Sequence, residues 1–187
     1  AGHVADDAGR DRDPETAARA EIAEETGLAD AVTLVRQGDP FRVADADRGV
    51  RWVVHPFLFD CEARTVTTNE ETTETTWAHP PEILARETVP RLWTSWDRVR
   101  PRVGTVREDR THGSAWLSLR ALEVLRDEAA LADVGRSDDL ETAERDGDDW
   151  DALAALAVEI RAARPSMVVV ANRLDRAIDA VTDESPA

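Results

Sequence analysis

Lysine and tyrosine are absent from this chain of 187 residues, and cysteine and methionine occur once each. The single cysteine, Cys61, cannot form a disulfide within the chain, which excludes a disulfide-stabilised scaffold. No apolar run approaches the ~20 residues that span a bilayer, and no secretory signal is visible. The sequence also lacks zinc-site spacing, a P-loop, a dinucleotide fingerprint and the Gly-x-Ser-x-Gly turn of serine hydrolases.

The charge of the chain is strongly one-sided. It has 39 acidic residues against 23 basic ones, all of them arginine, and its net charge is −16. Such an excess opposes nonspecific binding to nucleic acid or to an anionic membrane, so we expect neither partner. Concentrated salt screens self-repulsion of this kind, and the composition resembles that of cytoplasmic proteins from salt-adapted haloarchaea.

An acidic segment near the N-terminus has the features of a single helix. Pro14 suits a helix start, and Gly27 is placed to end the helix in a left-handed conformation. Glu21, Glu24 and Glu25 are spaced three and four residues apart, so they share one helix face. Oxygen ligands of this kind suit Mg²⁺ or Mn²⁺, so the face could bind a divalent metal. The ordinary alternative is that the three carboxylates simply face the solvent.

The order of residues in this helix resembles the core of the Nudix hydrolase box. Residues 20–28 have the sequence Ala-Glu-Ile-Ala-Glu-Glu-Thr-Gly-Leu, which matches the Nudix pattern Arg-Glu-apolar-x-Glu-Glu-x-Gly-apolar in every position except the first. Residues 1–4 look like the glycine-led opening of the same box. The resemblance implies metal binding by Gly2, Glu21, Glu24 and Glu25, with Glu21 and Glu25 as the catalytic residues. Glu21 is a ligand, an outer-sphere group or the base in this interpretation.

Two positions depart from the Nudix pattern. Ala20 occupies the usual arginine position, and Arg12 occupies the position of a glutamate that normally pairs with that arginine. The joint loss is physically consistent, because one remaining partner of a partly buried ion pair would be left uncompensated. Arg19 and Arg10 are the candidates to replace the missing arginine.

Downstream residues fit the same family. Residues 32–35 and 49–60 are rich in β-branched and aromatic residues and predict strands, with Pro56 at an edge or a bulge of the second. Residues 69–84 resemble the Nudix segment in which a glutamate precedes a strand ending in tryptophan, here Trp77, and a short helix. Glu71 is the candidate for the remote metal-binding carboxylate, with Glu70 and Glu74 as competitors. Exposed strand charges alternating with threonine explain the pattern equally well.

From about residue 92 onward the hydrophobic periodicity is helical. We expect helices at 114–130, 150–162 and 167–181, with a break at Pro165 and a solvated acidic loop at 137–149. Several apolar residues of the first of these helices are predicted to lie in the core: Leu117, Leu119, Ala121, Leu122 and Leu125.

This helical half carries a second resemblance. The sequence Arg-Thr-His-Gly-Ser-Ala-Trp-Leu at 110–117, with Ala-Arg-Pro-Ser-Met at 163–167 and Ala-Asn-Arg-Leu at 171–174, resembles the N-terminal helical part of the translation initiation factor 2B alpha/beta/delta family. That family includes sugar-phosphate isomerases, which implies phosphate binding at the helix start by Gly113 and Ser114. His112 stands where arginine is common. Arg164 either contacts the phosphate or caps helix carbonyls.

These patterns predict an α+β protein of two domains. Residues 1–91 are expected to form a partial Nudix α/β/α sandwich with a mixed sheet that lacks its first strands, and residues 92–187 an all-α bundle. We expect a fragment of a longer protein. The first hypothesis is a metal-dependent hydrolase of a nucleoside diphosphate linked to another group. The second is a ligand-sensing or regulatory protein whose helical half binds a sugar phosphate, a nucleotide monophosphate or a partner subunit. A third is a non-catalytic assembly fragment.

Overall fold

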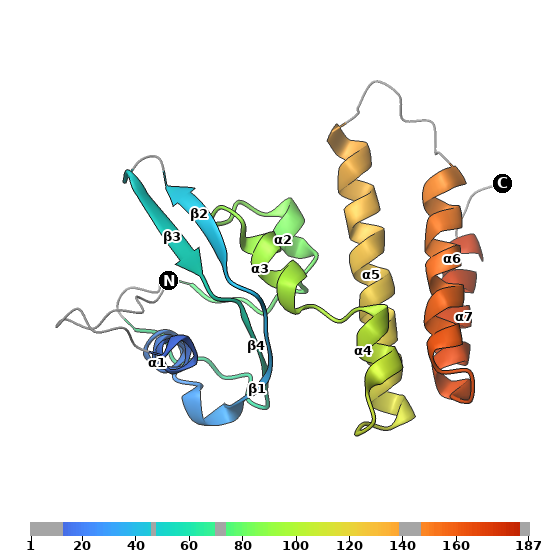
Figure 1. The fold of residues 1–187 in the computed structure, drawn as a ribbon, viewed down its shortest axis with the longest axis horizontal. Helices are drawn as coiled ribbons and strands as arrows, with labels where there is room; N and C mark the ends of the chain where they lie inside the picture. Colours follow the sequence, from blue (N-terminus) through green and yellow to red (C-terminus); the bar gives the residue numbers. More distant parts are fainter. Residues whose placement is uncertain (1–12, 46–47, 70–73, 139–146, 184–187) are drawn as a thin grey trace. The chain divides into compact units, whose positions relative to one another are not determined.

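The computed structural model describes residues 13–45, 48–69, 74–138 and 147–183 (Figure 1). It divides into two compact units, the first made of Ala1–His79 and Arg86–Val99 and the second of Pro80–Ala85 and Arg100–Ala187. Strands occur only in the first unit among the described residues, and the second is helical, which confirms the α+β class. No helix in these ranges is long and apolar enough to cross a membrane. The expected domain boundary between residues 91 and 92 stays a prediction.

The first unit combines three helical elements with four short strands. Its helices are α1 (Pro14–Thr26), the 3₁₀ turn η1 (Ala29–Ala31) and α3 (Leu92–Val99). Its strands are β1 (Val32–Gln37), β2 (Phe41–Asp45), β3 (Val50–Val54) and β4 (Phe57–Cys61). β1 pairs with β4 and β2 pairs with β3, both antiparallel. The described strands therefore form two antiparallel pairs rather than the mixed sheet that we expected.

The predicted strand at 49–60 is two strands, separated at His55 and Pro56. Pro56 has no N–H to donate to a ladder, and its carbonyl instead accepts a hydrogen bond from the Gly38 N–H at 2.9 Å. The expected strand ending at Trp77 is also wrong for the residues that the structure describes, because residues 74–79 are not in a strand. The Trp77 indole is 54% exposed and donates to the Arg64 carbonyl at 3.0 Å.

The end of α3 is fixed on the connection between β1 and β2. The Arg36 guanidinium donates to the Val99 carbonyl at 2.7 Å, and that of Arg98 donates to the Asp39 carbonyl at 3.0 Å. A Cβ at Gly38 would lie 2.9 Å from the Cβ of Arg98, so only glycine lets the two segments approach this closely. These contacts explain how a helix outside the β-pairs is held within the first unit.

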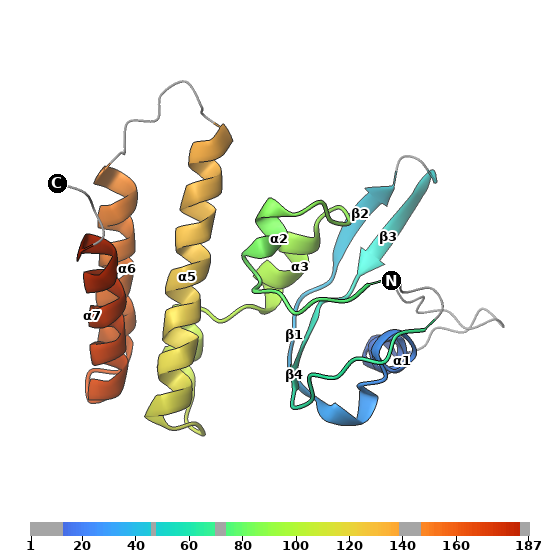
Figure 2. The same cartoon turned by 180° about the vertical axis from the view of Figure 1, so that it is seen from behind.

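The second unit contains α2 (Glu82–Ala85), α4 (Val103–Glu108), α5 (Ser114–Asp138), α6 (Gly147–Ala163) and α7 (Val168–Asp183). The short helix predicted within 80–84 and the three long helices are thus confirmed, with α5 longer than expected. Figures 1 and 2 show α5, α6 and α7 side by side. Their contacting faces and α4 enclose one apolar core, whose fully buried members include Val106, Leu117, Ala121, Ile160, Val170 and Leu174.

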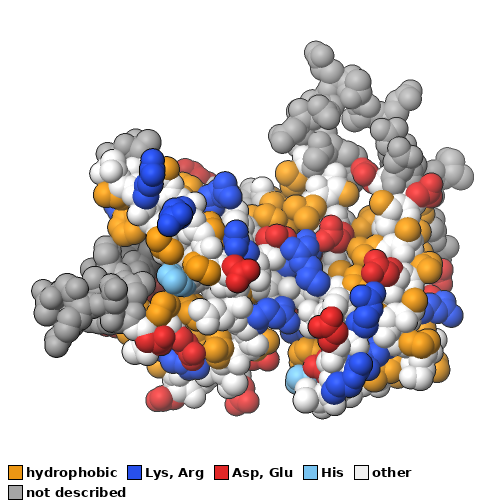
Figure 3. Space-filling model, in the orientation of Figure 1, with side chains coloured by type: hydrophobic (Ala, Val, Ile, Leu, Met, Phe, Trp, Pro, Cys, Tyr) orange, Lys and Arg blue, Asp and Glu red, His pale blue; other side chains and the backbone are white. Residues whose placement is uncertain are grey.

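Leu119 corrects one part of the predicted core, since its side chain is 48% exposed. Leu117, Ala121 and Val124 are buried because they recur at helical spacing, and Leu119 lies between them on another face of α5. Charged side chains of both signs lie interspersed on this unit in Figure 3. Some are buried: Asp127 is fully enclosed and accepts from Arg126 at 2.6 Å.

Candidate functional sites

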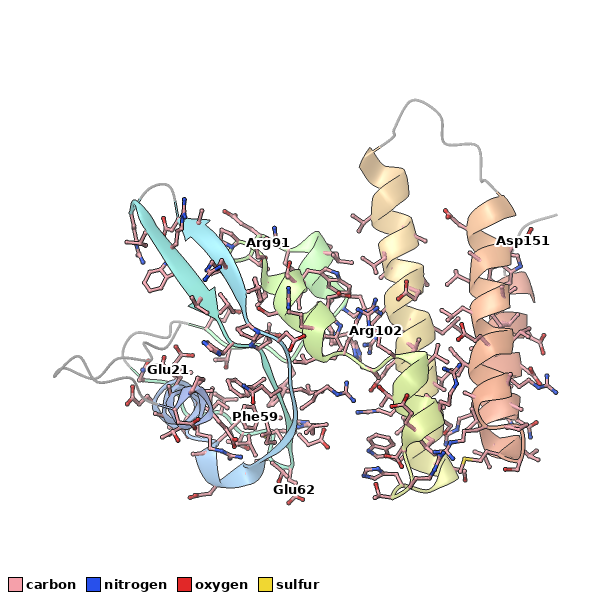
Figure 4. All side chains as sticks on the ribbon, viewed as in Figure 1. Glu21, Phe59, Glu62, Arg91, Arg102 and Asp151 are labelled. Carbon is pink, nitrogen blue, oxygen red and sulfur yellow. The ribbon has the colours of Figure 1, made fainter. Side chains whose placement is uncertain are left out.

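The three glutamates of the acidic helix lie on α1 as predicted. Glu21 is half-buried, whereas Glu24 and Glu25 are exposed; Figure 4 labels Glu21 on this helix. The helix begins at Pro14, and the Asp13 side chain caps it by accepting from the Thr16 backbone N–H at 3.0 Å.

The end of α1 has the left-handed glycine that the sequence predicted. Gly27 has φ +68°, and its N–H donates to the Ala23 carbonyl at 3.0 Å. The segment that contains Thr67 closes over this turn, because the Thr67 N–H donates to the Thr26 carbonyl at 2.9 Å. A Cβ on Gly27 would lie 3.3 Å from the Thr67 Cβ. A distant part of the chain therefore fixes the helix end just after Glu24 and Glu25.

Arg19 makes an ion pair on α1, where the Nudix pattern would place an arginine one position later. Its Nε lies 2.9 Å from the Glu15 carboxylate. The guanidinium carbon lies 5.0 Å from the centre of the Phe59 ring on β4, and Nη1 lies 3.5 Å from the Val32 carbonyl. Arg19 thus connects one side of α1 to the β1–β4 pair, and its role as a replacement for the missing arginine stays a prediction.

The described carboxylates do not by themselves assemble a metal site. Gly2, Glu70 and Glu71 lie outside the described residues, and Glu74 is exposed. In residues 13–45, 48–69, 74–138 and 147–183, no group of three or more His, Cys, Asp or Glu side chains is placed to hold a metal ion. The oxygen donors on α1 suit Mg²⁺ or Mn²⁺ chemically, but one helix supplies only part of a coordination shell.

The start of α5 forms a second candidate site. Gly113 is exposed, its carbonyl accepts the first helical bond from the Leu117 N–H at 3.1 Å, and Ser114 is the first helical residue. No atom would lie within 4 Å of a Cβ on Gly113. An open helix start with free backbone N–H groups is a favourable place for an anion.

A cluster that sequence reasoning missed lies immediately before this helix. The Asp109 carboxylate accepts from the backbone N–H groups of Thr111 at 3.0 Å and His112 at 2.8 Å, and it lies 2.7 Å from the His112 Nδ1. The His112 ring stacks on Trp116, with ring centres 3.9 Å apart and planes inclined by 13°. His112 is three residues after Asp109 and four before Trp116, so closeness in sequence is the signal available for this cluster.

The surroundings of Asp109 determine its charge. Burial raises the pKa of this carboxyl, but the hydrogen bonds from the His112 side chain and from the backbone of His112 and Thr111 outweigh burial, and the positive charge of His112 acts in the same direction. The net result lowers its pKa from 3.8 to about 2. Asp109 is therefore a stable anion that orients the His112 ring.

Arg164 occupies the turn between α6 and α7. Its Nε donates to the Val106 carbonyl in the last turn of α4 at 2.7 Å, which matches the second of the two roles given above, the capping of helix carbonyls. Its Nη2 is enclosed and has no hydrogen-bond partner in the part of the chain that the structure describes. A contact between Arg164 and a phosphate stays a prediction.

Comparison with known proteins gives one family match. The model of the "Initiation factor 2 subunit family" (IF-2B) matches residues 110–186. This range begins one residue after Asp109 and includes α5, α6 and α7, so the helical part of the chain is similar to that family. The match does not extend to α1 or the strands. No curated protein and no solved structure matches the chain.

Proposed function

We propose that the chain joins an initiation-factor-2B-like module, which binds a phosphorylated small molecule at the start of α5, to a Nudix-type hydrolase unit. The observation that carries the proposal for the module is the family match over 110–186. Its N-terminal limit coincides with the exposed turn around Gly113, where the family resemblance implies phosphate binding.

The geometry at the start of α5 supports a small anionic ligand. The unpaired N–H groups of its first turn and the helix dipole favour negative charge. Arg110 lies beside this turn, and its guanidinium donates to the carbonyls of Arg107 and Asp109. Within the ranges that the structure describes, no carboxylate neutralises its positive charge. A sugar phosphate or a nucleotide monophosphate fits this arrangement better than a bare anion, because the exposed turn leaves room for the rest of the molecule.

The module is tested by calorimetric titration of the full chain with ribose 5-phosphate and with AMP. Gly113→Asp places a carboxylate at the N-cap, which favours the helix but occupies the N–H groups and repels phosphate. We expect wild-type binding that this variant abolishes while its thermal stability is kept. Ala155→Asp adds the same charge at an exposed position of α6 and serves as the matched control. Equal binding by Gly113→Asp and wild type would contradict phosphate binding at this turn.

The hydrolase proposal rests on α1. Glu21, Glu24 and Glu25 share one helix that ends at a left-handed glycine, which is the local geometry expected of a Nudix box. Glu24 and Glu25, with Gly2 and Glu71, would hold Mg²⁺ or Mn²⁺, and Glu21 would orient or deprotonate water. The bound metal would supply charge neutralisation on the diphosphate. The substrate class is a nucleoside diphosphate linked to another group, and the surrounding fold would be a Nudix sandwich.

The hydrolase unit is tested by phosphate release from a panel of nucleoside diphosphate derivatives in concentrated KCl. We expect Mg²⁺-dependent turnover that Glu25→Gln removes. Glu62→Gln changes an exposed carboxylate just after β4 and should leave turnover unchanged. Turnover that is unaffected by Glu25→Gln would rule out α1 as the catalytic helix.

A ligand-sensing or regulatory protein is the second candidate. It rests on the same family match over residues 110–186, which covers the helices that would hold the ligand. Binding of ribose 5-phosphate or AMP by a folded chain that hydrolyses nothing in the panel would select this function. Turnover with any substrate would exclude it.

A further inference from the structure

Trp77 is the largest of the exposed apolar side chains in the part of the chain that the structure describes, and it is 54% exposed. We infer that the free face of its indole stacks on the nucleobase of a nucleotide-derived ligand. The inference rests on the proposed hydrolase function of the first unit. It assigns a contact to the part of the substrate that the metal-binding helix does not contact, the base.

The indole of Trp77 is held from two sides. Its Nε1–H donates to the Arg64 carbonyl at 3.0 Å, which fixes one edge of the ring. The guanidinium carbon of Arg64 lies 4.7 Å from the ring centre and covers one face. That guanidinium is itself anchored, because its Nη1 donates to the Cys61 carbonyl at 2.8 Å and to the Ala63 carbonyl at 3.3 Å. The ring therefore has a fixed plane, and its exposed area includes the face opposite Arg64.

A fixed and exposed aromatic plane is a suitable surface for a nucleobase. Stacking on an aromatic side chain is favourable for every base, because each base has a π-face. A ring that is already held in place also loses little conformational entropy when the base binds. The net charge of −16 opposes binding of a nucleic acid, so we expect the base to belong to a single nucleotide or its derivative.

The position of the indole relates it to the acidic helix. Thr67, three residues after Arg64, donates its N–H to the Thr26 carbonyl at the end of α1 at 2.9 Å. Three extended residues span at most about 10–11 Å, so the Arg64 carbonyl lies within that reach of the last turn of α1. Figures 1 and 2 show the segment after β4 running beside this helix. This separation is comparable to the length of a nucleoside diphosphate, so the diphosphate of a stacked nucleotide would reach Glu24 and Glu25.

The first test is NMR of the indole N–H signals of the full chain in KCl, titrated with adenosine and separately with ribose 5-phosphate. Adenosine has the base without a phosphate, and ribose 5-phosphate has the phosphate without a base, so neither titration depends on a metal or on turnover. The Trp77 signal, assigned from its absence in Trp77→Leu, should shift with adenosine and not with ribose 5-phosphate. The remaining indole signals should stay in place with adenosine.

Two variants separate stacking from the hydrogen bond to Arg64. Trp77→Phe and Trp77→Leu both lose the bond from Nε1, but only Trp77→Phe keeps an aromatic face. One stacked base corresponds to about a fivefold to 150-fold change in affinity. In the hydrolase assay we expect Trp77→Leu to raise the KM for an ADP-linked substrate by a factor in this range, with kcat nearly unchanged. Trp77→Phe should keep a KM close to that of wild type.

The outcomes distinguish this inference from the hydrolase proposal. An unmoved Trp77 signal in adenosine, or equal KM values for Trp77→Leu and wild type, would overturn base stacking. Equal losses in Trp77→Phe and Trp77→Leu would also overturn it, since the bond to Arg64 would then account for the effect. A shifted Trp77 signal in a chain that hydrolyses no member of the panel would support base stacking and overturn only the hydrolase proposal.

Discussion

Gly27 offers the most direct test of how the acidic helix is held. Gly27→Ala places a side chain at φ +68°, a conformation that costs an L-residue about 1–2 kcal/mol. The new Cβ would also lie 3.3 Å from the Thr67 Cβ, closer than an ordinary van der Waals contact. Relieving that contact adds about 1 kcal/mol, the lower end of the usual cost of overpacking. We expect a loss of about 2–3 kcal/mol in the free energy of unfolding.

Gly49 provides a matched control within the same unit. It has φ +64°, and no atom would lie within 4 Å of a Cβ placed on it. Gly49→Ala therefore has the same conformational cost without the contact to Thr67, and should destabilise the unit by about 1–2 kcal/mol. The difference between the two variants isolates the contribution of the Thr67 contact.

The assay is urea unfolding of the full chain in KCl, followed by tryptophan fluorescence. Amide hydrogen exchange of residues 14–26 serves as the local readout, and it should accelerate more in Gly27→Ala than in Gly49→Ala. Equal effects of the two substitutions on stability and on exchange would refute the close packing of Thr67 on the end of α1. The hydrolase proposal would then lose the contact that fixes the helix end after Glu25.

Three further predictions concern the second unit. Because the pKa of Asp109 is lowered from 3.8 to about 2, its negative charge stabilises the fold above pH 3.8. This stabilisation should disappear as the pH falls toward 2. Acid unfolding followed by circular dichroism should detect the loss in wild type and not in Asp109→Asn. Ile160→Ala removes a fully buried side chain from the core and should cost about 2–5 kcal/mol in urea unfolding. Arg164→Met deletes the bond to the Val106 carbonyl and should cost about 1–3 kcal/mol by the same assay, and a change below 0.5 kcal/mol would contradict the capping role.

The acidic helix was predictable because its signals are local. Pro14 at the start, Gly27 at the end and the spacing of the glutamates are all read within one segment, and each is confirmed. The strands were harder, because β-pairing joins distant residues. The apolar run at 49–60 appeared continuous, but Pro56 cannot donate to a ladder, and β2 was not predicted at all.

The two candidate sites were predictable to different extents because one needs a residue far away in the sequence and the other is built from neighbouring residues. The proposed metal site on α1 would need a carboxylate about fifty residues away, Glu71, whose position relative to Glu24 and Glu25 no periodicity specifies. The turn before α5 depends on contacts within eight residues, from Asp109 to Trp116. Gly113, Ser114 and His112 were recognised from the sequence, but the contact between Asp109 and His112 was not.

The locality of that cluster also bears on function. Since Asp109, His112 and Trp116 are joined by contacts within one turn and the first turn of α5, their geometry does not depend on how the two units are placed. A ligand bound there would contact groups that the second unit alone supplies. For such a ligand to regulate the first unit, its binding would have to alter the structure or stability of residues outside this turn. Binding without regulation would need no such alteration. Hydrogen exchange of α1 with and without ribose 5-phosphate separates the two, because coupling requires that protection of α1 changes when the α5 site is filled.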